Sequence, residues 1–487
     1  MHISDVRKFL RCPRLYQYSL KDNQKSFPYF NINVSIDDSI VNKLRIDNYY
    51  LGRVNEDNDN TAEALKEHEW LLKARFTYRG LRCRVPYLYH KDSHCDLYFS
   101  SYSVNPTDGE ADNIMWTAAV VEKNGLTVDN IYIIYPNKEY ERSGELDHEA
   151  LWNITDHFFN GNGHPTKHIL TYIRNKNFEI DGVLDILLHF DSGFEEEAVR
   201  TSKCAGRNKC PYYEKCFPEE SRVPDNSILT LMGSQYKYEM YRSGIRFLRD
   251  VNTDKFEGSQ QQFAQIMADR QGGRFFDKLA LSDWLNNNSG YPMSFIDFEW
   301  DLYLVPPYDG MHPLDVNLFQ YSLHIMNEDG TVTHKQFIGE RDCREEFLKR
   351  MLEDIPDEGV IFAYNARGAE ILRLRELQRY FPQYSDQLEG VISRFVDLAL
   401  PFVNGVVYDV RMRGMYSLKV IQEMLDDERS YHDLAVENGL DAVAIHRLLE
   451  QCDDPETKKQ YYEDLYEYCG LDSYAMIEVY NWLISLI

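Results

Sequence analysis

The amino-acid sequence predicts a mixed α/β protein with more than one domain. With 487 residues, the chain is too long for a single ordinary hydrophobic core, so two or three domains are expected. Hydrophobic residues make up 43% of the chain and aromatic residues 14%, which indicates packed globular domains. Changes in pattern place an N-terminal domain of mixed helices and strands at 1–225, a helical connector at 226–290 and an α/β domain at 291–487.

The order of elements is clearest in the C-terminal domain. Apolar or alternating segments predict strands at 293–298, 319–325, 331–337 and 359–364. Amphipathic segments predict helices at 344–353 and 370–380, and the residues from about 385 onward are expected to be almost wholly helical. Three strands, a helix, a strand and then helices is the order of a ribonuclease-H-like fold.

Charge and cysteine content restrict the class of protein. A net charge of −26 argues against a general nucleic-acid coat protein, although residues 199–250 hold ten Lys/Arg against six Asp/Glu. No apolar run is long enough for a membrane span or a signal peptide, so we expect a cytoplasmic protein with no membrane partner. The nine cysteines form no regular disulfide framework. Five of them are scattered and are expected to be packing residues: Cys83, Cys95, Cys343, Cys452 and Cys469.

Acidic residues in the C-terminal domain form the first candidate site. Asp297 and Glu299 stand at i and i+2 of a predicted strand, so their carboxylates share a face. Tyr468 and Asp472 stand at i and i+4 of a predicted helix and also share a face. Neighbouring carboxylates repel unless a cation lies between them, and hard oxygen ligands suit Mg²⁺ or Mn²⁺.

A third segment, Tyr364-Asn-Ala-Arg-Gly-Ala-Glu370, follows the predicted buried strand at 359–364. Together the three motifs resemble the DEDD exonuclease superfamily. There an Asp-x-Glu, an Asn followed by an acid, and a Tyr-x-x-x-Asp supply four metal-binding carboxylates. The resemblance implies that two metal ions bind Asp297, Glu299, Glu370 and Asp472, and that Tyr468 orients the attacking water.

The fourth ligand stays open between two acids. Glu370 stands where the superfamily usually has aspartate, and it lies one residue further from Asn365 than the superfamily pattern expects. Asp397 is the alternative acid, although its position is also typical of a helix cap. Candidates for holding the substrate backbone are Asn365, Arg367 and Arg373, whereas a solvated helix face paired with Glu376 is the alternative for the arginines near this helix.

Residues 291–487 also resemble the bacterial family DUF2779, a domain of unknown function. The segments that carry this resemblance are Phe295-Ile-Asp-Phe-Glu, Phe319-Gln-Tyr-Ser-Leu-His, Arg394-Phe-Val-Asp-Leu, Gly414-Met-Tyr-Ser-Leu-Lys-Val and Tyr468-Cys-Gly-Leu-Asp-Ser. The family name implies no activity, so the functional prediction depends on the exonuclease-like motifs.

Cysteines in the N-terminal domain form a second candidate site. Cys204, Cys210 and Cys216 are closely spaced in a basic, aromatic run, which favours a metal site over disulfides. A tetrahedral site needs a fourth thiolate, and Cys12 is the candidate. One N-terminal cysteine and three at the far end of the domain resemble Cas4-like and AddB-like RecB-family nucleases. That resemblance implies a [4Fe–4S] cluster, and Zn²⁺ is the alternative because the same thiolates bind either.

The same resemblance implies a restriction-endonuclease-like, Cas4-like fold whose catalytic residues are missing here. The family cuts DNA with an aspartate followed by Glu-x-Lys, but Leu97 and Phe99 stand where Glu and Lys belong on a predicted strand at 97–101. Pro86 falls near the expected aspartate, and Trp116 occupies the place of a later glutamine. We therefore expect the fold without its chemistry.

The motifs together predict a metal-dependent 3′→5′ exonuclease that hydrolyses phosphodiester bonds with two metal ions. DNA is favoured over RNA because the N-terminal resemblance is to DNA nucleases. The alternative is a non-catalytic nucleic-acid-binding or partner-docking protein in a DNA repair or defence assembly. A redox sensor using the cysteines is a third hypothesis, which needs exposed and changeable ligation.

Overall fold

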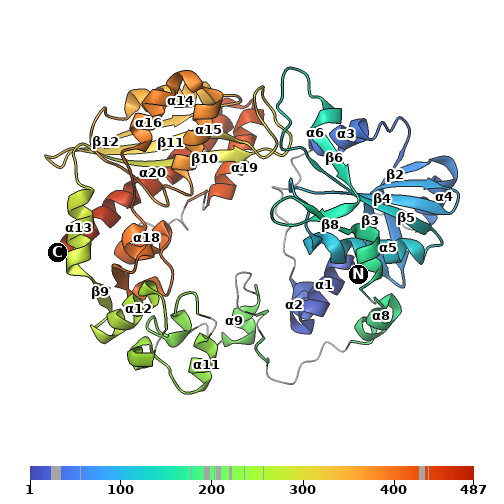
Figure 1. Cartoon of the computed structure of the whole chain (residues 1–487), viewed down its shortest axis with the longest axis horizontal. Helices are drawn as coiled ribbons and strands as arrows, with labels where there is room; N and C mark the ends of the chain where they lie inside the picture. Colours follow the sequence, from blue (N-terminus) through green and yellow to red (C-terminus); the bar gives the residue numbers. More distant parts are fainter. Residues whose placement is uncertain are drawn as a thin grey trace. The chain divides into compact units, whose positions relative to one another are not determined.

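The computed structural model describes residues 1–22, 34–54, 56, 58–176, 178–190, 198–201, 203–204, 210–218, 222–234, 236–255, 257–426, 434–436 and 438–487. They form two compact units, each combining sheets and helices as the α/β class predicts (Figure 1). Unit 1 contains Met1–Cys216 and Tyr303–Asp315, and unit 2 contains Phe217–Leu302 and Val316–Ile487. The chain therefore enters unit 2 after Cys216, and the segment predicted as a connector belongs to that unit.

Unit 1 is built on a six-stranded sheet in the order β1-β2-β3-β4-β5-β6. The strands are β1 (Tyr50–Leu51), β2 (Trp70–Tyr78), β3 (Leu81–Lys91), β4 (His94–Ser100), β5 (Thr127–Pro136) and β6 (Trp152–Thr155). Strands β2, β3 and β4 form an antiparallel meander, and helix α5 (Ala111–Glu122) then leads to β5, which runs parallel to β4. The predicted strand at 97–101 is thus largely confirmed as the C-terminal half of β4.

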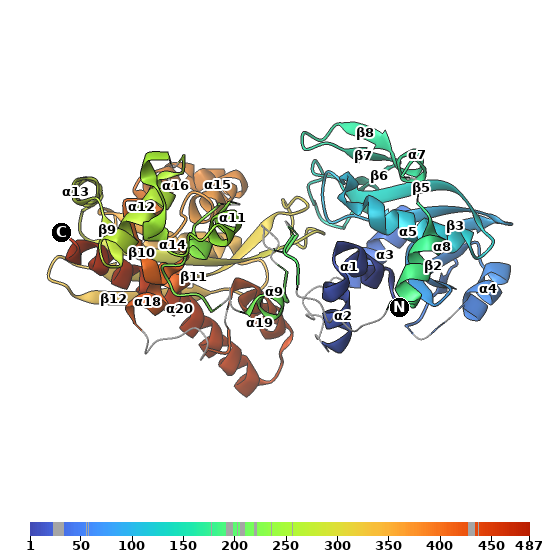
Figure 2. The same ribbon diagram turned by 90° about the horizontal axis from the view of Figure 1, so that it is seen from below.

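Helices pack on this sheet because its strands alternate apolar and polar residues. The helices of unit 1 are α1 (Ile3–Arg11), α2 (Pro13–Lys21), α3 (Val34–Lys43), α4 (Asn58–Glu67), α5, α6 (His148–Leu151), α7 (Ile169–Arg174), α8 (Ile180–Leu188) and α9 (Tyr213–Cys216). One hydrophobic core joins the sheet to α1, α5, α7 and α8, and a second joins it to α3. A small separate hairpin consists of β7 (His157–Phe159) and β8 (Pro165–His168), as Figure 2 shows.

Unit 2 contains a five-stranded sheet in the order β12-β11-β10-β13-β14. The strands are β10 (Met293–Leu302), β11 (Val316–Met326), β12 (Val332–Ile338), β13 (Ile361–Ala363) and β14 (Phe395–Asp397). Strand β11 runs antiparallel to both neighbours, and β10, β13 and β14 are parallel. A second sheet pairs β9 (Arg274–Phe276) with β15 (Val407–Asp409).

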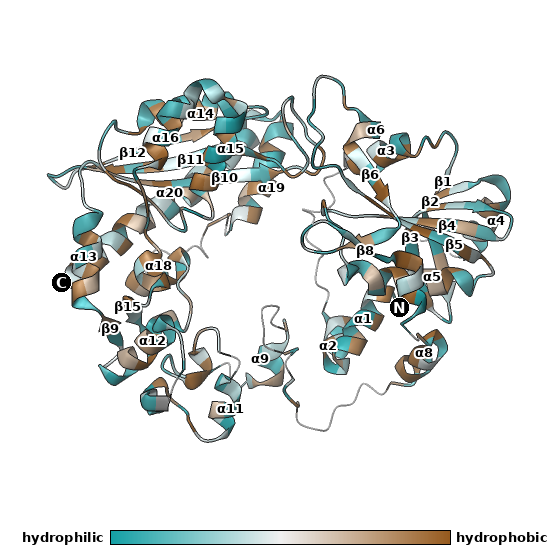
Figure 3. Ribbon diagram, viewed as in Figure 1, coloured by the Kyte–Doolittle hydropathy of each residue, from teal (hydrophilic) through white to brown (hydrophobic). Residues whose placement is uncertain are grey.

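The two faces of the five-stranded sheet are covered by different helices (Figure 1). Helices α14 (Arg344–Asp354), α15 (Glu370–Tyr380) and α16 (Ser385–Ile392) cover one face, and α20 (Pro455–Ser485) covers the other. The other helices are α11 (Lys237–Arg242), α12 (Gln260–Arg270), α13 (Lys278–Asn287), α17 (Leu400–Val403), α18 (Leu418–Leu425) and α19 (Gly439–Gln451). In Figure 3, α14 and α15 show both hydrophilic and hydrophobic residues, as expected for helices with one buried face.

Most predicted elements of the C-terminal domain are confirmed, with boundaries that differ by a few residues. The prediction that 385–487 is almost wholly helical is wrong, because β14 and β15 lie within it, and β9 interrupts the helices of the predicted connector. Each of these strands has three residues, which is too short to show a period-two pattern. Their conformation depends on pairing with strands distant in sequence. Among the described helices, none has the length and apolar character of a membrane span.

Candidate functional site

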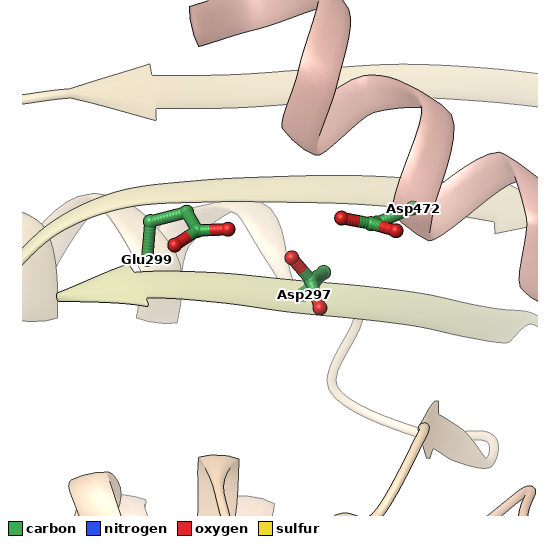
Figure 4. A group of neighbouring side chains, drawn as sticks. All are labelled: Asp297, Glu299 and Asp472. Atoms are coloured by element: carbon green, nitrogen blue, oxygen red, sulfur yellow. The ribbon is translucent and has the colours of Figure 1, made fainter. Parts of the chain in front are cut away.

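Three carboxylates from two elements of unit 2 meet in one place. Asp297 and Glu299 come from β10 and Asp472 from α20, and Figure 4 shows the three side chains directed toward one another. One carboxylate oxygen of each lies within 4.8 Å of the others. Glu299 and Asp472 are buried and Asp297 is partly buried. This is the arrangement that the two sequence spacings predict separately, now joined by the packing of α20 on the sheet.

The strand direction of β10 explains why both acids face the same helix. Ile296 and Phe298 enter the core beneath α14–α16, so their neighbours at alternate positions turn to the opposite face. On α20, Tyr468 and Asp472 are both buried, at 4% and 7% exposure, although each carries a polar group. The helix thus presents a phenol and a carboxylate to the strand at one point.

The charges of this cluster oppose one another. Burial and then the Asp472 carboxylate raise the pKa of Glu299 to about 8, although Lys419 acts in the opposite direction. Burial, Asp472, Glu299 and Glu370 raise the pKa of Asp297 well above its ordinary value, while a hydrogen bond from Cys469 lowers it. Without a cation between them, Asp297 and Glu299 are therefore more readily protonated than ordinary carboxylates.

Glu370 joins the cluster through the first turn of α15. Glu370 is 2% exposed. Burial, followed by the charges of Asp397 and Asp472, raises its pKa to about 8, whereas a hydrogen bond from its own backbone N–H lowers it. Within the described part of the chain, its Oε2 has no hydrogen-bond partner. A buried carboxylate oxygen without a donor fits a cation ligand, because a metal ion satisfies it where no N–H does.

Asp397 occupies a different position, although it is close enough to raise the pKa of Glu370. Its Oδ1 accepts backbone N–H groups from Asn365 at 2.9 Å and from Ala399 at 3.0 Å. Asn365 adopts a left-handed conformation with φ of 64°, which asparagine tolerates better than most residues. Asp397 therefore holds the loop before α15 to the start of α17, and it caps neither helix, since the N-cap residues are Ala369 and Ala399 and neither helix has a side-chain cap.

Lys419 and Cys469 are neighbours of the acids that sequence reasoning missed. The Nζ of Lys419 donates to the Tyr468 hydroxyl at 3.2 Å and lies 4.7 Å from the ring centre. The Cys469 thiol donates to Asp297 Oδ2 at 3.5 Å, so this cysteine contacts the site as well as packing in the core. Burial and the charges of the nearby acids raise the pKa of Tyr468. The DUF2779-like segment Gly414-Met-Tyr-Ser-Leu-Lys-Val contains Lys419 but gave it no role at the site, because it lies 49 residues from Tyr468 on a separate helix.

The proposed backbone-binding residues differ in their availability. Asn365 and Arg367 are exposed on the loop before α15. The side chain of Arg373 is only 12% exposed, pairs with Glu376 at 3.0 Å and lies 5.3 Å from the Trp300 ring centre. The alternative of a pair with Glu376 therefore describes Arg373, and Arg367 remains the exposed candidate.

The four cysteines of the second candidate site all belong to unit 1. Burial raises the pKa of the Cys216 thiol. The Cys12 and Cys210 thiols raise it further, whereas Arg14 lowers it. The Cys210 N–H donates to the Cys204 carbonyl at 3.0 Å. Arg11 also donates to the Lys203 carbonyl at 3.0 Å, so the two ends of the domain meet near these residues. Among the described residues, however, no group of three or more of these cysteines has its thiol sulfurs within 4.8 Å of one another. Arg207 and Lys209, which belong to the basic run, lie outside the described residues.

The predicted remnant of a nuclease site in unit 1 is apolar. Leu97 and Phe99 on β4 are 0% and 7% exposed and belong to the main core of the unit. Trp116 on α5 is in the same core and packs edge-on against Phe178. Pro86 lies within β3. These side chains offer no oxygen ligand, so they cannot hold a divalent cation.

A family model described as a domain of unknown function, DUF2779, matches residues 294–417. This match supports the resemblance to that family for the segment that holds Asp297, Glu299 and Glu370. It ends before Tyr468 and Asp472. No curated protein and no solved structure matches the chain.

Proposed function

We propose that this protein is a metal-dependent 3′→5′ exonuclease acting on nucleic acid, with DNA favoured over RNA. The observation that carries the proposal is the convergence of Asp297, Glu299 and Asp472 within 4.8 Å, with Glu370 in electrostatic range. The order and directions of the strands around them support a ribonuclease-H-like domain. The 3′→5′ direction follows from the resemblance to DEDD exonucleases.

The donor set fits hard divalent cations. The set consists of carboxylate oxygens, which Mg²⁺ and Mn²⁺ prefer as ligands. Among the described residues, Oε2 of Glu370 has no hydrogen-bond partner and is available as a metal ligand. When bound, two such ions polarise a phosphodiester and stabilise the charge on the attacking and leaving oxygens. Asp297, Glu299 and Asp472 would hold the ions, and Glu370 would complete the set.

The remaining residues orient the reactants. The hydroxyl of Tyr468 accepts from Lys419 at 3.2 Å, and burial and the nearby acids raise its pKa, so it is a neutral hydroxyl close to the carboxylates. This suits a group that orients a water molecule by hydrogen bonding. Arg367 is exposed beside the same site and can bind a phosphate of the substrate.

The decisive experiment measures digestion of end-labelled single- and double-stranded DNA and RNA with Mg²⁺ or Mn²⁺. Wild-type protein should shorten one or more of these substrates from the 3′ end, and Asp297→Ala should not. Glu328→Gln is a matched control, because Glu328 is an exposed acid in the turn between β11 and β12. Digestion by wild type and Asp297→Ala at equal rates rejects the proposal.

We further propose that unit 1 is a Cas4-like domain that binds nucleic acid and holds a [4Fe–4S] cluster. The element order of its sheet and the contact of Arg11 with the Lys203 carbonyl, which brings the residue before Cys12 to the residue before Cys204, support this. The thiols of Cys12, Cys204, Cys210 and Cys216 would ligate the cluster, which joins the two ends of the domain.

Metal analysis tests the cluster. Protein purified anaerobically should be brown and contain roughly four irons per chain. One zinc per chain in colourless protein supports the alternative metal at the same residues. Protein without either metal rejects both, and Cys12→Ser should then behave like wild type.

The second candidate function is a non-catalytic nucleic-acid-binding or partner-docking protein. The apolar character of Leu97 and Phe99 favours it, because these core side chains leave β4 without carboxylate ligands for a catalytic metal. Titration with Mn²⁺ separates the two functions. An exonuclease should bind two ions at the acids of unit 2, and a docking protein should bind none there.

A further inference from the structure

Strand β3 presents basic residues on one face of the unit 1 sheet. Leu81, Cys83 and Val85 are buried in the core, so Arg82 and Arg84 at the alternate positions lie on the opposite face, where both are exposed. This charge stands out in a chain whose net charge is −26.

The neighbouring strand extends the same basic surface. Arg75 on β2 pairs directly with Arg84, and Thr77 pairs with Arg82. Like charges directly opposite one another on a sheet are destabilising. Burial first, and then Arg84, lower the pKa of Arg75, although Glu56 partly offsets them. An external anion on this face would relieve the repulsion.

Two carboxylates that interact with these arginines, Asp37 and Glu56, are already engaged. Asp37, which interacts with Arg84, accepts from Lys73 and from the Tyr87 hydroxyl, both at 2.6 Å. Glu56 accepts the backbone N–H of Arg53 at 2.5 Å. Within the described residues, the guanidinium groups of Arg82 and Arg84 form no ion pair or hydrogen bond, and Nε of Arg75 is buried without a partner.

We propose that the surface formed by Arg75, Arg82 and Arg84, the arginine face, binds the phosphodiester backbone of nucleic acid. Guanidinium groups match phosphate oxygens in a bidentate geometry. Arg82 and Arg84 are two residues apart on one strand, about 6.6 Å at the usual rise, so they form a row. A polymer with one charge at each nucleotide fits such a row better than a single anion does. The proposal rests on the proposed function only in taking nucleic acid as the polymer.

The test measures binding without catalysis. A fluorescent single-stranded DNA of about 20 nucleotides is titrated with full-length protein in EDTA, at salt between about 50 and 200 mM. The double variant Arg82→Gln/Arg84→Gln should bind at least ~10-fold more weakly, and its salt slope should fall by about 1.4, because two phosphate contacts are lost. The variant Arg82→Lys/Arg84→Lys should keep the slope, because the charges remain.

A matched control removes two charges elsewhere in unit 1. Arg45→Gln/Lys66→Gln changes an arginine that is 80% exposed and an exposed lysine, and it should leave the slope unchanged. Equal slopes for wild type and Arg82→Gln/Arg84→Gln, with equal melting temperatures, overturn the proposal. Displacement of the DNA by equimolar pyrophosphate also overturns it, because the face is then a site for small anions.

Hydrolysis of a mononucleotide nitrophenyl ester separates this proposal from the exonuclease. The ester carries a single phosphate, which the acids of unit 2 would bind for cleavage, so Arg82→Gln/Arg84→Gln should hydrolyse it at the wild-type rate with Mn²⁺. If wild type itself fails to cleave the ester while the DNA binding depends on the arginines, the exonuclease proposal fails and the arginine face stands.

Discussion

Strand β10 of unit 2 and strand β4 of unit 1 each carry a pair of inward-facing residues at i and i+2 in a mixed sheet. On β10 the pair is Asp297 and Glu299, and on β4 it is Leu97 and Phe99. Both pairs are largely buried, and both sheets are covered by helices. Both pairs follow the same i, i+2 alternation on a strand, so the side chains determine whether the pair can bind a cation.

The energetic consequences of the two pairs are opposite. A buried Leu or Phe side chain stabilises a fold by about 1.5–3 kcal/mol, whereas a buried carboxylate without a partner destabilises it. Burial is the largest cause of the raised pKa values of Glu299 and Glu370, which is the direction that this unfavourable term predicts. Two residues at i and i+2 of a strand can therefore form part of a hydrophobic core or a charged site. Only the charged site needs a cation to be stable when its carboxylates are ionised.

The largest expected effect is the loss of turnover when the acids of unit 2 are removed. Asp297→Ala or Asp472→Ala should lower digestion on the order of 10⁴-fold, and the double variant should be little worse, because such ligands act as a unit. Rates of digestion with Mn²⁺ measure this, with Glu328→Gln as the control. Digestion by the double variant at the wild-type rate would assign catalysis to unit 1 and reverse the comparison.

Placing charges on β4 should disrupt unit 1 without creating activity. Leu97→Glu/Phe99→Lys puts ionisable groups at positions that are 0% and 7% exposed, which should destabilise the unit by about 3–5 kcal/mol. Nuclease activity should not rise in an Asp297→Ala background, because Pro86 supplies no carboxylate. Denaturant unfolding is the measurement, and Leu97→Met is the volume-matched control. A well-folded, Mn²⁺-binding variant would show that β4 is a latent site.

Tyr468→Phe should lower turnover by 10²- to 10⁴-fold, the range for removal of an acid–base or water-orienting group. The change removes one hydroxyl and leaves the acids in place, so Mn²⁺ affinity should stay at the wild-type value. Steady-state digestion and Mn²⁺ titration are measured on the same preparation. Tyr466→Phe, on the same helix, is the control. Loss of Mn²⁺ binding in Tyr468→Phe would contradict a role limited to orientation.

Glu370→Asp should reduce turnover by about tenfold, because the shorter side chain no longer reaches from the start of α15. Digestion rates of this variant are compared with those of Glu370→Gln. Asp397→Ala should mainly affect stability, since Asp397 holds two backbone N–H groups of the adjacent segments. An inactive Asp397→Ala together with a fully active Glu370→Asp would make Asp397 the fourth ligand.

The smallest effect is a pH dependence of the metal-free protein. The pKa values of Glu299 and Glu370, both about 8, exceed the ordinary value of 4.5, so the folded state binds their protons more tightly than the unfolded state. Their contribution to stability is complete below pH about 4.5 and is lost as pH rises through about 8. In EDTA the melting temperature should therefore fall over this range, and Mn²⁺ should raise it most at high pH.

A matched variant isolates this contribution from other titrating groups. Glu299→Gln/Glu370→Gln cannot ionise, so its melting temperature should depend less on pH over the same range. Identical pH profiles for the variant and the metal-free wild type would show that the two carboxylates do not titrate as described.

The sequence determined the pieces of the candidate site because each motif is local. The i, i+2 spacing of Asp297 and Glu299 put both on one strand face, and the i, i+4 spacing of Tyr468 and Asp472 put both on one helix face. The strands and helices between 293 and 380 followed from periodicity for the same reason. The apolar state of Leu97 and Phe99 was also evident, since residue type alone excludes metal ligation there.

Only the tertiary structure determined which residues of the candidate site lie next to one another. The packing of α20 on β10 brings Asp472 to Asp297 across 175 positions of sequence, and α18 brings Lys419 to Tyr468. The short strands β9, β14 and β15 exist through their pairing partners rather than through a pattern of their own. The roles of Glu370 and Asp397 also needed the fold: the first carboxylate lies buried with an oxygen that has no partner among the described residues, and the second accepts two backbone N–H groups. Local periodicity carries no information about which distant surfaces bury one another, because that burial depends on the whole chain.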